Sequence, residues 1–187
     1  MWGWDRFSNS GEKRKPMDNT SAGHNAEIVW LLLHALEILQ IDALPFDEKI
    51  TKALDHAVAN GIDREYGGVY VEGPHTGGVT DKEKEFWQQV EVMIGMLDGC
   101  IRYRSEKYWK AYENVHSFLF RKGINHDLGE LWPLLSREGE PIWTHMGHAW
   151  KTSYHSVRGM IQCIKRLDRL LGSAGNSYRF GLTTPLR

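Results

Sequence analysis

Apolar residues recur along most of this chain at spacings of three and four residues, the period of an α-helix that buries one face. The pattern predicts helices at residues 24–40, 47–60, 82–104, 106–122 and 153–171. In the first helix the apolar stripe consists of Ile28, Leu31, Leu32, Ala35, Leu36 and Leu39. Thr20 or Ser21 is expected to cap the N-terminal end of that helix, and Ser105 that of the fourth. The pattern therefore predicts an all-α fold.

Two segments interrupt the helical period. Residues 67–74 alternate in character and are bounded by glycine and proline, so they predict a short strand or hairpin arm. Residues 130–142 predict a second hairpin, with its turn at Glu138-Gly139-Glu140. The resulting order, helix, helix, hairpin, helix, helix, hairpin and helix, indicates repeated αα-hairpins. Such units suit an α/α toroid, in which long loops on one face build the active site.

Length and composition agree with one folded domain. The chain has 187 residues, of which 41% are hydrophobic and 25% charged, enough to bury a core and keep a polar surface. Residues 1–20 are polar with scattered aromatics and are interpreted as an N-terminal loop or hairpin remnant. Residues 21–172 form the predicted helical domain, and residues 173–187 are expected to be a C-terminal tail.

The net charge and the short apolar runs of the chain disfavour two classes of partner. The net charge of −1 and the pI near 6.8 leave no basic excess for neutralising phosphates, so no nucleic-acid partner is expected. No apolar run reaches the roughly 18 residues of a membrane-spanning helix, so no membrane partner is expected. The first six residues, MWGWDR, lack the apolar core of a signal peptide.

The two cysteines, Cys100 and Cys163, each stand alone within a helical pattern. This arrangement favours two buried free thiols in a reducing compartment over a disulfide or a zinc framework. We therefore expect a cytoplasmic protein. His145 and His148 stand three residues apart, but no carboxylate or cysteine stands at ligand spacing and Gly147 interrupts any helix between them. No metal site and no cofactor are predicted.

Two histidines carry the candidate chemistry. His24, in Gly23–Trp30, and His155, in Trp150–Arg158, each lie near the start of an apolar helical segment. An imidazole gives or takes a proton near neutral pH, so two of them supply what proton transfer on a sugar requires. The chain is also rich in aromatic residues, with eight Trp, seven Tyr and six Phe. Aromatic side chains serve either core packing or sugar binding, and composition alone leaves both open.

Four segments, in order, resemble motifs of the N-acylglucosamine 2-epimerase and cellobiose 2-epimerase family. The segment Gly23–Glu27 resembles the family's Gly-His-Asp-x-Glu, and Gly67–Tyr70 its Gly-Gly hairpin. The segment Lys84–Glu91 resembles Lys-x-Trp-Trp-x-Gln-x-Glu, and Trp150–Arg158 resembles Trp-Lys-x-Pro-Tyr-His-x-x-Arg. The departures from the family motifs are Asn25 for an acid, Phe86 for a tryptophan and Ser153 for a proline.

The resemblance implies a fold and an assembly. The family folds as an (α/α)6 barrel about twice as long as this chain, so residues 21–172 are expected to form a partial barrel that corresponds to the C-terminal half. The N-terminal half of the family supplies a substrate-contacting arginine and a further active-site histidine, which have no equivalents here. A half barrel exposes the apolar faces that would meet the missing half. We therefore expect either a homodimer or a partner chain covering the open face.

The resemblance also implies a site and a reaction. His24 and His155 would remove and return the C2 proton of a mono- or disaccharide through an enediolate, without a metal or redox cofactor; which histidine is the base stays open. The expected substrate-binding residues are Glu27, Trp87, Glu91 and Arg158. Each has an ordinary structural alternative, namely a capping carboxylate for Glu27, core packing for Trp87 and an ion pair for Arg158.

Two other functions fit the same scaffold. The chain is either an isomerase or a truncated, non-catalytic carbohydrate-binding or interaction module. A glycoside hydrolase is the other alternative, because this barrel also hosts such enzymes. A hydrolase needs two carboxylates across a cleft, for which Glu27 and Glu91 are the candidates.

Overall fold

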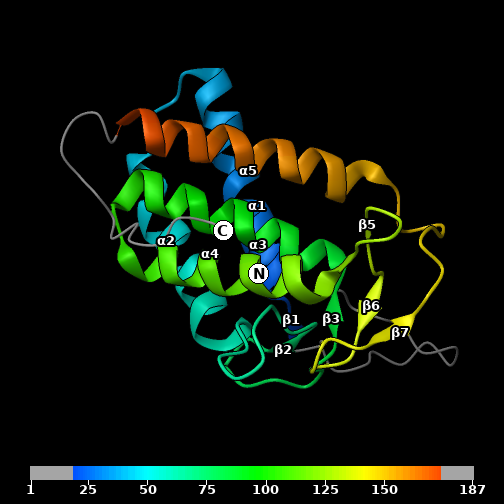
Figure 1. The fold of residues 1–187 in the computed structure, drawn as a ribbon. Helices are drawn as coiled ribbons and strands as arrows, with labels where there is room; N and C mark the ends of the chain where they lie inside the picture. Colours follow the sequence, from blue (N-terminus) through cyan, green and yellow to red (C-terminus); the bar gives the residue numbers. More distant parts are fainter. Residues whose placement is uncertain (1–18, 174–187) are drawn as a thin grey trace, which may run out of the picture.

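The computed structural model describes residues 19–173, and their fold is predominantly helical, as predicted (Figure 1). The helices are α1 (Ala22–Leu39), α2 (Asp47–His56), α3 (Phe86–Tyr103), α4 (Glu106–Phe118) and α5 (Ser153–Ser173). Wider π-helical turns, Ala57–Gly61 and Leu119–Gly123, extend α2 and α4 to the ends that the sequence predicts. A short 3-10 turn, Leu44–Phe46, precedes α2. Apart from the first strand and the end of α5, the predicted terminal segments 1–20 and 173–187 lie outside the described residues.

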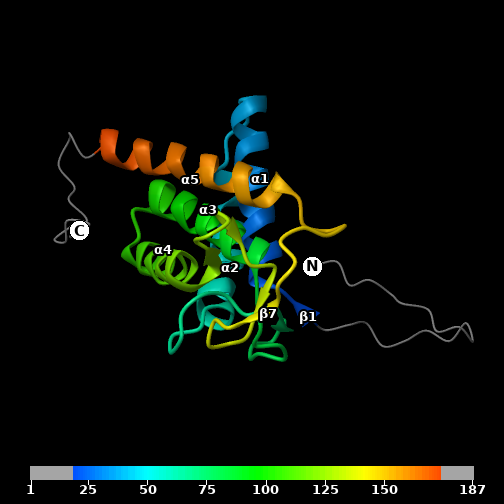
Figure 2. The same ribbon diagram turned by 45° about the vertical axis from the view of Figure 1, so that its right-hand side comes forward.

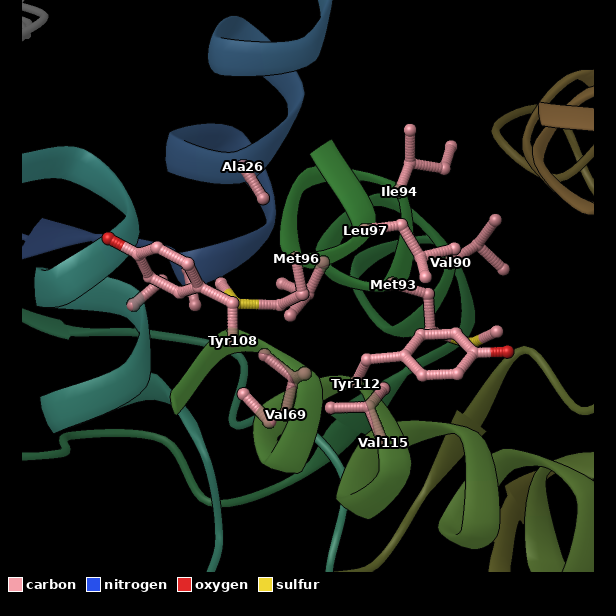
Figure 3. Close-up of a cluster of buried hydrophobic side chains, with 14 of the residues drawn as sticks. Ala26, Val69, Val90, Met93, Ile94, Met96, Leu97, Tyr108, Tyr112 and Val115 are labelled. Carbon is pink, nitrogen blue, oxygen red and sulfur yellow. The ribbon is translucent and has the colours of Figure 1, made fainter. Parts of the chain in front are cut away.

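Helix α3 is the centre of the fold. Helices α1, α4 and α5 all pack against it, and the two views of the ribbon show it between them (Figures 1 and 2). Every residue from Gln88 to Cys100 is buried. Figure 3 shows Met93, Met96 and Leu97 of α3 in one buried cluster with Tyr108 and Tyr112 of α4. Each fully buried side chain of this size stabilises the fold by about 1.5–3 kcal/mol relative to exposure to water.

The predicted start of α3 at residue 82 is wrong by four residues. Lys84 and Glu85 form strand β3 (Lys84–Glu85) instead, which pairs antiparallel with β6 (Leu134–Leu135). Strand β6 also pairs with β7 (Pro141–Trp143), so the second predicted hairpin is present, with Gly139 at its turn in a left-handed conformation (φ 92°). Inter-strand hydrogen bonds at residues 84 and 85 take the place of the expected first helical turn. The spacing of apolar residues cannot predict such pairing with a distant strand.

The other short strands form two separate pairs. Strand β5 (Glu130–Leu131) pairs with β4 (Ile124–Asn125) and not within the second hairpin, so the predicted extent of that hairpin, 130–142, is too long. Strand β2 (Gly73–Pro74) pairs with β1 (Asn19–Thr20), and the predicted hairpin arm at 67–74 is mostly a loop. That loop is fixed to α3 because Gln89 accepts from the N–H of Val69 at 2.7 Å and donates to its carbonyl at 2.9 Å.

The structure also bears on the two cysteines and on the apolar length of the helices. Both cysteines are free and buried, as expected, and burial raises the pKa of each thiol to about 12. None of the helices between residues 19 and 173 combines the length and the apolar character needed to cross a membrane.

A buried cluster of charged side chains joins three segments that are distant in the sequence. Asp63 and Lys84 are fully buried and lie 3.0 Å apart, and Arg137 of the β6–β7 turn reaches Asp63 at 2.9 Å. Burial alone would raise the pKa of Asp63, but hydrogen bonds from Arg137, Lys84 and two backbone N–H groups outweigh it and hold that pKa far below its usual range. Burial lowers the pKa of Lys84 to about 8. The charges of Asp63 and Lys84 therefore depend on the ion pair between them and on the further hydrogen bonds to Asp63.

Replacing Asp63 with asparagine is expected to lower the free energy of unfolding by about 3–5 kcal/mol at pH 7, because it leaves the Lys84 charge buried without its partner. The folded-state pKa of Asp63 is depressed, so its contribution is present above the unfolded pKa and lost as the pH falls. As the pH falls below the unfolded-state pKa of about 4, the stability advantage of the wild type should shrink progressively, and part of it should still remain at about pH 3 because folded Asp63 stays ionised there. Urea denaturation at several pH values measures this. Glu140→Gln, which removes an exposed ion pair with Lys122, should change stability by less than about 1 kcal/mol.

Candidate active site

The N-terminal ends of helices α1, α3 and α5 surround one cleft of about 400 Å³, a volume in the range of small-molecule sites. The ends of α3 and α5 lie together beside β3, β6 and β7 (Figure 1). The first turns of the three helices place His24, Trp87 and His155 in the cleft wall. Helix N-termini carry a partial positive charge, so this arrangement favours a ligand that is or becomes negative. A second hollow, beside His56, has room for about one water molecule only, with a volume of about 10 Å³.

His24 is held at the start of α1 by the cap of that helix. Ser21 is the N-cap, as predicted, and its Oγ accepts from the backbone N–H of His24 at 3.1 Å. The same Oγ lies 2.8 Å from Nδ1 of the His24 ring. A hydroxyl group both donates and accepts, so Ser21 supports His24 whether or not Nδ1 carries a proton.

His155 is held by a buried carboxylate. Its Nδ1 lies 2.6 Å from Oε1 of Glu91, which has no exposed side-chain surface. The other carboxylate oxygen of Glu91 accepts from the indole N–H of Trp30 at 2.7 Å. Arg158, one turn after His155, completes the set by donating from its guanidinium to Glu91. The guanidinium also lies 4.7 Å from the ring centre of Trp30 and 4.3 Å from that of Tyr154.

The charge of Glu91 selects the tautomer of His155. Burial alone would raise the pKa of Glu91, but the hydrogen bonds from His155, Arg158 and Trp30 outweigh burial and lower it. An ionised carboxylate only accepts hydrogen bonds, so Nδ1 of His155 must carry the proton that joins the two groups. Nε2 of the neutral ring is then the free base.

Close packing of α5 on α3 brings His155 and Glu91 together. Gly159 lies one turn after His155, and a Cβ atom added there would stand only 2.0 Å from Cγ1 of Val90. The absence of a side chain therefore lets the two helices approach closely beside the His155–Glu91 contact.

The ring of Trp87 contacts the rings of both histidines. Its ring centre is 4.7 Å from that of His24 and 5.5 Å from that of His155, and its half-buried indole lines the cleft. The side chain therefore packs against the core on one side and faces the cleft on another.

Glu27 completes the polar wall of the cleft. It is partly buried, and burial, together with the nearby negative charge of Glu91, raises its pKa. Ligand atoms of Glu27, Glu91 and His155 lie within 4.8 Å of one another, a spacing that suits metal coordination. The guanidinium of Arg158 already contacts Glu91, and its positive charge opposes a cation at that point.

The structure brings all six predicted site residues together but gives them two different places. His24, Glu27, Trp87 and His155 line the cleft, as a substrate-contacting group would. Glu91 and Arg158 lie behind His155, with their polar atoms engaged by protein partners. Sequence reasoning missed several further lining residues: Glu85, Phe86, His148, Trp150 and Tyr154. All of these except His148 belong to the quoted motif segments, which was the available signal.

Comparisons with known proteins show what the whole chain is similar to. The family model described as N-acylglucosamine 2-epimerase (GlcNAc 2-epimerase) matches residues 4–159. The cellobiose 2-epimerase of Eubacterium cellulosolvens is 27% identical over 176 residues, which cover 86% of this chain and 42% of that protein. The N-acylglucosamine 2-epimerase of Bos taurus is 27% identical over 167 residues, covering 87% of this chain and 39% of the relative.

Solved structures show the same fold. The cellobiose 2-epimerase of Bacillus thermoamylovorans superposes with a TM-score of 0.73 at 24% identity, covering 86% of this chain and 40% of that structure. A D-mannose isomerase superposes with a TM-score of 0.68 at 25% identity, covering 78% and 37%. The predicted fold class, αα-hairpins that resemble half of an (α/α)6 barrel, is confirmed. This chain spans about two fifths of the length of the relatives that it matches. The match over residues 4–159 shows that the chain belongs to the N-acylglucosamine 2-epimerase family.

Proposed function

We propose that this chain carries the proton-transfer site of a sugar isomerase that acts at C2, by 2-epimerisation or aldose–ketose isomerisation of a mono- or disaccharide. The observation that carries the proposal is the ionised, buried Glu91 behind His155, which leaves Nε2 of a cleft histidine as a free base. The contact of His24 with the same Trp87 ring, in the wall of the same cleft, supports a second proton-transfer group.

The proposed reaction begins with the open-chain aldose in the cleft. His155 Nε2 takes the C2 proton, the C–H electron pair forms the C1–C2 double bond, and the carbonyl π electrons move to O1 to give an enediolate. The imidazolium formed on His155 is stabilised by Glu91, and the helix N-termini around the cleft favour the negative charge on oxygen. Return of a proton to the other face of C2 by His24, as the O1 electron pair re-forms the C1 carbonyl, gives the epimer. Return of a proton to C1 gives the ketose once the O2 proton has moved to O1 and the C2 carbonyl forms.

Glu27 and Trp87 would bind the sugar. Burial and the nearby charge of Glu91 raise the pKa of Glu27, and its carboxyl group is placed in the cleft wall to accept from a sugar hydroxyl when ionised and to donate when protonated. The face of Trp87 offers an apolar surface for the ring. A glycoside hydrolase is less well supported, because Glu91 is fully buried and engaged and is not presented across the cleft to Glu27.

Proton NMR of sugars incubated with the protein in D2O tests the proposal. N-acetylmannosamine, mannose and cellobiose are the probes, since the relatives' names point to these three substrate types. Deuterium at C2 of one sugar would establish the chemistry and the substrate class. Binding of a sugar without exchange, at high protein concentration, would instead favour the non-catalytic carbohydrate-binding module.

The open side of the helical layer supports an assembly. Large apolar side chains stand exposed along α1 and α5: Ile28, Leu31, Ile38, Leu39, Val157, Ile161, Ile164 and Leu171. Exposed apolar surface of this kind marks interfaces. We therefore propose that a second copy or a partner chain covers it. Replacing Ile38 and Ile164 with glutamate should shift the species in small-angle scattering toward the monomer. A wild-type protein that is already monomeric at high concentration would contradict the homodimer and leave the partner chain, which co-purification of an untagged companion chain would test.

A further inference from the structure

Lys151 is a buried cation that the proposed chemistry does not use. It is 5% exposed and lies between the segment that follows β7 and the start of α5. Its Nζ donates to the backbone carbonyl of Met146 at 2.7 Å and lies 3.4 Å from Oε1 of Glu130. An ammonium group is costly to remove from water, so its burial here depends on these specific partners.

Through these partners Lys151 connects four parts of the fold. Its backbone N–H donates to the carbonyl of His148 at 2.9 Å and closes a tight turn. Glu130 of β5 also accepts from Oγ of Ser156, in the first turn of α5, at 3.3 Å. The ammonium group lies 5.1 Å from the ring centre of Phe86, at the start of α3. One side chain therefore ties the segment 146–150 to β5, to α3 and, through Glu130, to the helix that carries His155.

The segment that Lys151 holds forms one wall of the cleft. His148 and Trp150 both line it. Trp150 is 88% exposed, so little packing fixes its indole, and its position follows from the backbone that carries it. The backbone N–H of Trp150 donates to Nδ1 of His148 at 3.2 Å, which joins the two lining residues to each other.

We propose that Lys151 is a positioning residue, whose buried ammonium group holds the segment 146–150 against the ends of α3 and α5 so that Trp150 and His148 form a preformed wall for the ligand. Naming that ligand as a sugar rests on the proposed function. Holding the wall in place before binding removes the entropy cost of ordering it afterwards. The expected loss on removing the charge is therefore in ligand binding more than in the chemical step.

Hydrogen exchange measured by mass spectrometry on the full chain tests the positioning role directly. Lys151→Met keeps the length of the side chain and removes its charge and donors. Amide exchange in residues 145–151 is expected to rise at least about tenfold, with α3 and α4 unchanged, because only the local opening becomes easier. Lys151→Arg, which keeps the charge, should lie between the wild type and Lys151→Met. The matched control is Lys122→Met, which removes an exposed ammonium group paired with Glu140.

Sugar kinetics supply a second measurement. In Lys151→Met the KM is expected to rise by about tenfold with a smaller change in kcat, the signature of lost binding. Unchanged exchange in residues 145–151, or an equal rise in α3 and α4, would overturn the proposal. Glu130→Gln weakens the same ion pair by removing the charge of its other member. If Lys151→Met does not fold, amide exchange of residues 145–151 in Glu130→Gln tests the proposal instead. If no sugar is turned over by the wild type, the proposed function fails while the exchange experiment still tests Lys151.

Discussion

Replacing His155 with alanine is expected to lower the rate of deuterium incorporation at C2 by roughly 10²- to 10⁴-fold, the usual contribution of a positioned general base. The reason is geometric, since Nε2 is the free nitrogen of a ring whose other nitrogen is held at 2.6 Å by Glu91. Proton NMR in D2O measures the rate directly. The alanine variant leaves Glu91 paired with Arg158, so the carboxylate does not lose all its partners.

The control for this experiment is His126→Ala. His126 is an exposed histidine whose Nε2 lies 3.0 Å from the carbonyl of Phe120, away from the cleft. Its replacement should leave the exchange rate unchanged. If His155→Ala retained more than about a tenth of the wild-type rate, His155 would not be the general base and the two-histidine proposal would be wrong.

Replacing Glu91 with glutamine is expected to lower kcat by about 100-fold with little change in KM, because the amide no longer fixes one tautomer of His155 or stabilises its charged form. Nitrogen NMR of labelled histidine provides a readout beyond rate. In the wild type the proton should reside on Nδ1 of His155, and in Glu91→Gln the ring should populate both neutral tautomers.

Asp98→Asn is the matched control for Glu91→Gln. Asp98 is a second buried carboxylate of α3 and makes two hydrogen bonds of 2.8 Å to Arg166 of α5. Both variants break a buried charge pair between the same two helices, and each should cost about 3–5 kcal/mol of stability. Only Glu91→Gln should slow turnover. Equal losses of rate in both variants would mean that Glu91 acts through stability and not through His155.

The sequence predicts the helices well because each has an apolar face. The stripe that includes Ile94 and Leu97 marks α3 correctly. The same reasoning cannot see that α3 is covered by α1, α4 and α5 at once, so that its polar residues are buried as well. Glu91 is an example, since its partners Trp30 and Arg158 lie 61 and 67 residues away in the chain.

The candidate site also combines features that the sequence predicts with features that only the packed structure reveals. Motif resemblance points to His24 and His155, and the structure places both in the wall of one cleft. The resemblance does not separate residues that face the cleft from residues that support them. That distinction depends on the depth of each side chain below the surface, which separates the lining Glu27 from the buried Glu91. Depth is a property of the packed helices and is not encoded in local spacing.

The close contact at Gly159 has a consequence for protein engineering. The position admits no side chain because Val90 occupies the space, and one turn away the same helix carries His155. Under the proposed function, a library that varies the cleft-lining residues Glu85 and Trp150 would test new sugars while the helix spacing stays constant. Random mutagenesis that also reaches residue 159 would mix changes of specificity with losses of catalytic alignment, so that codon is best left fixed.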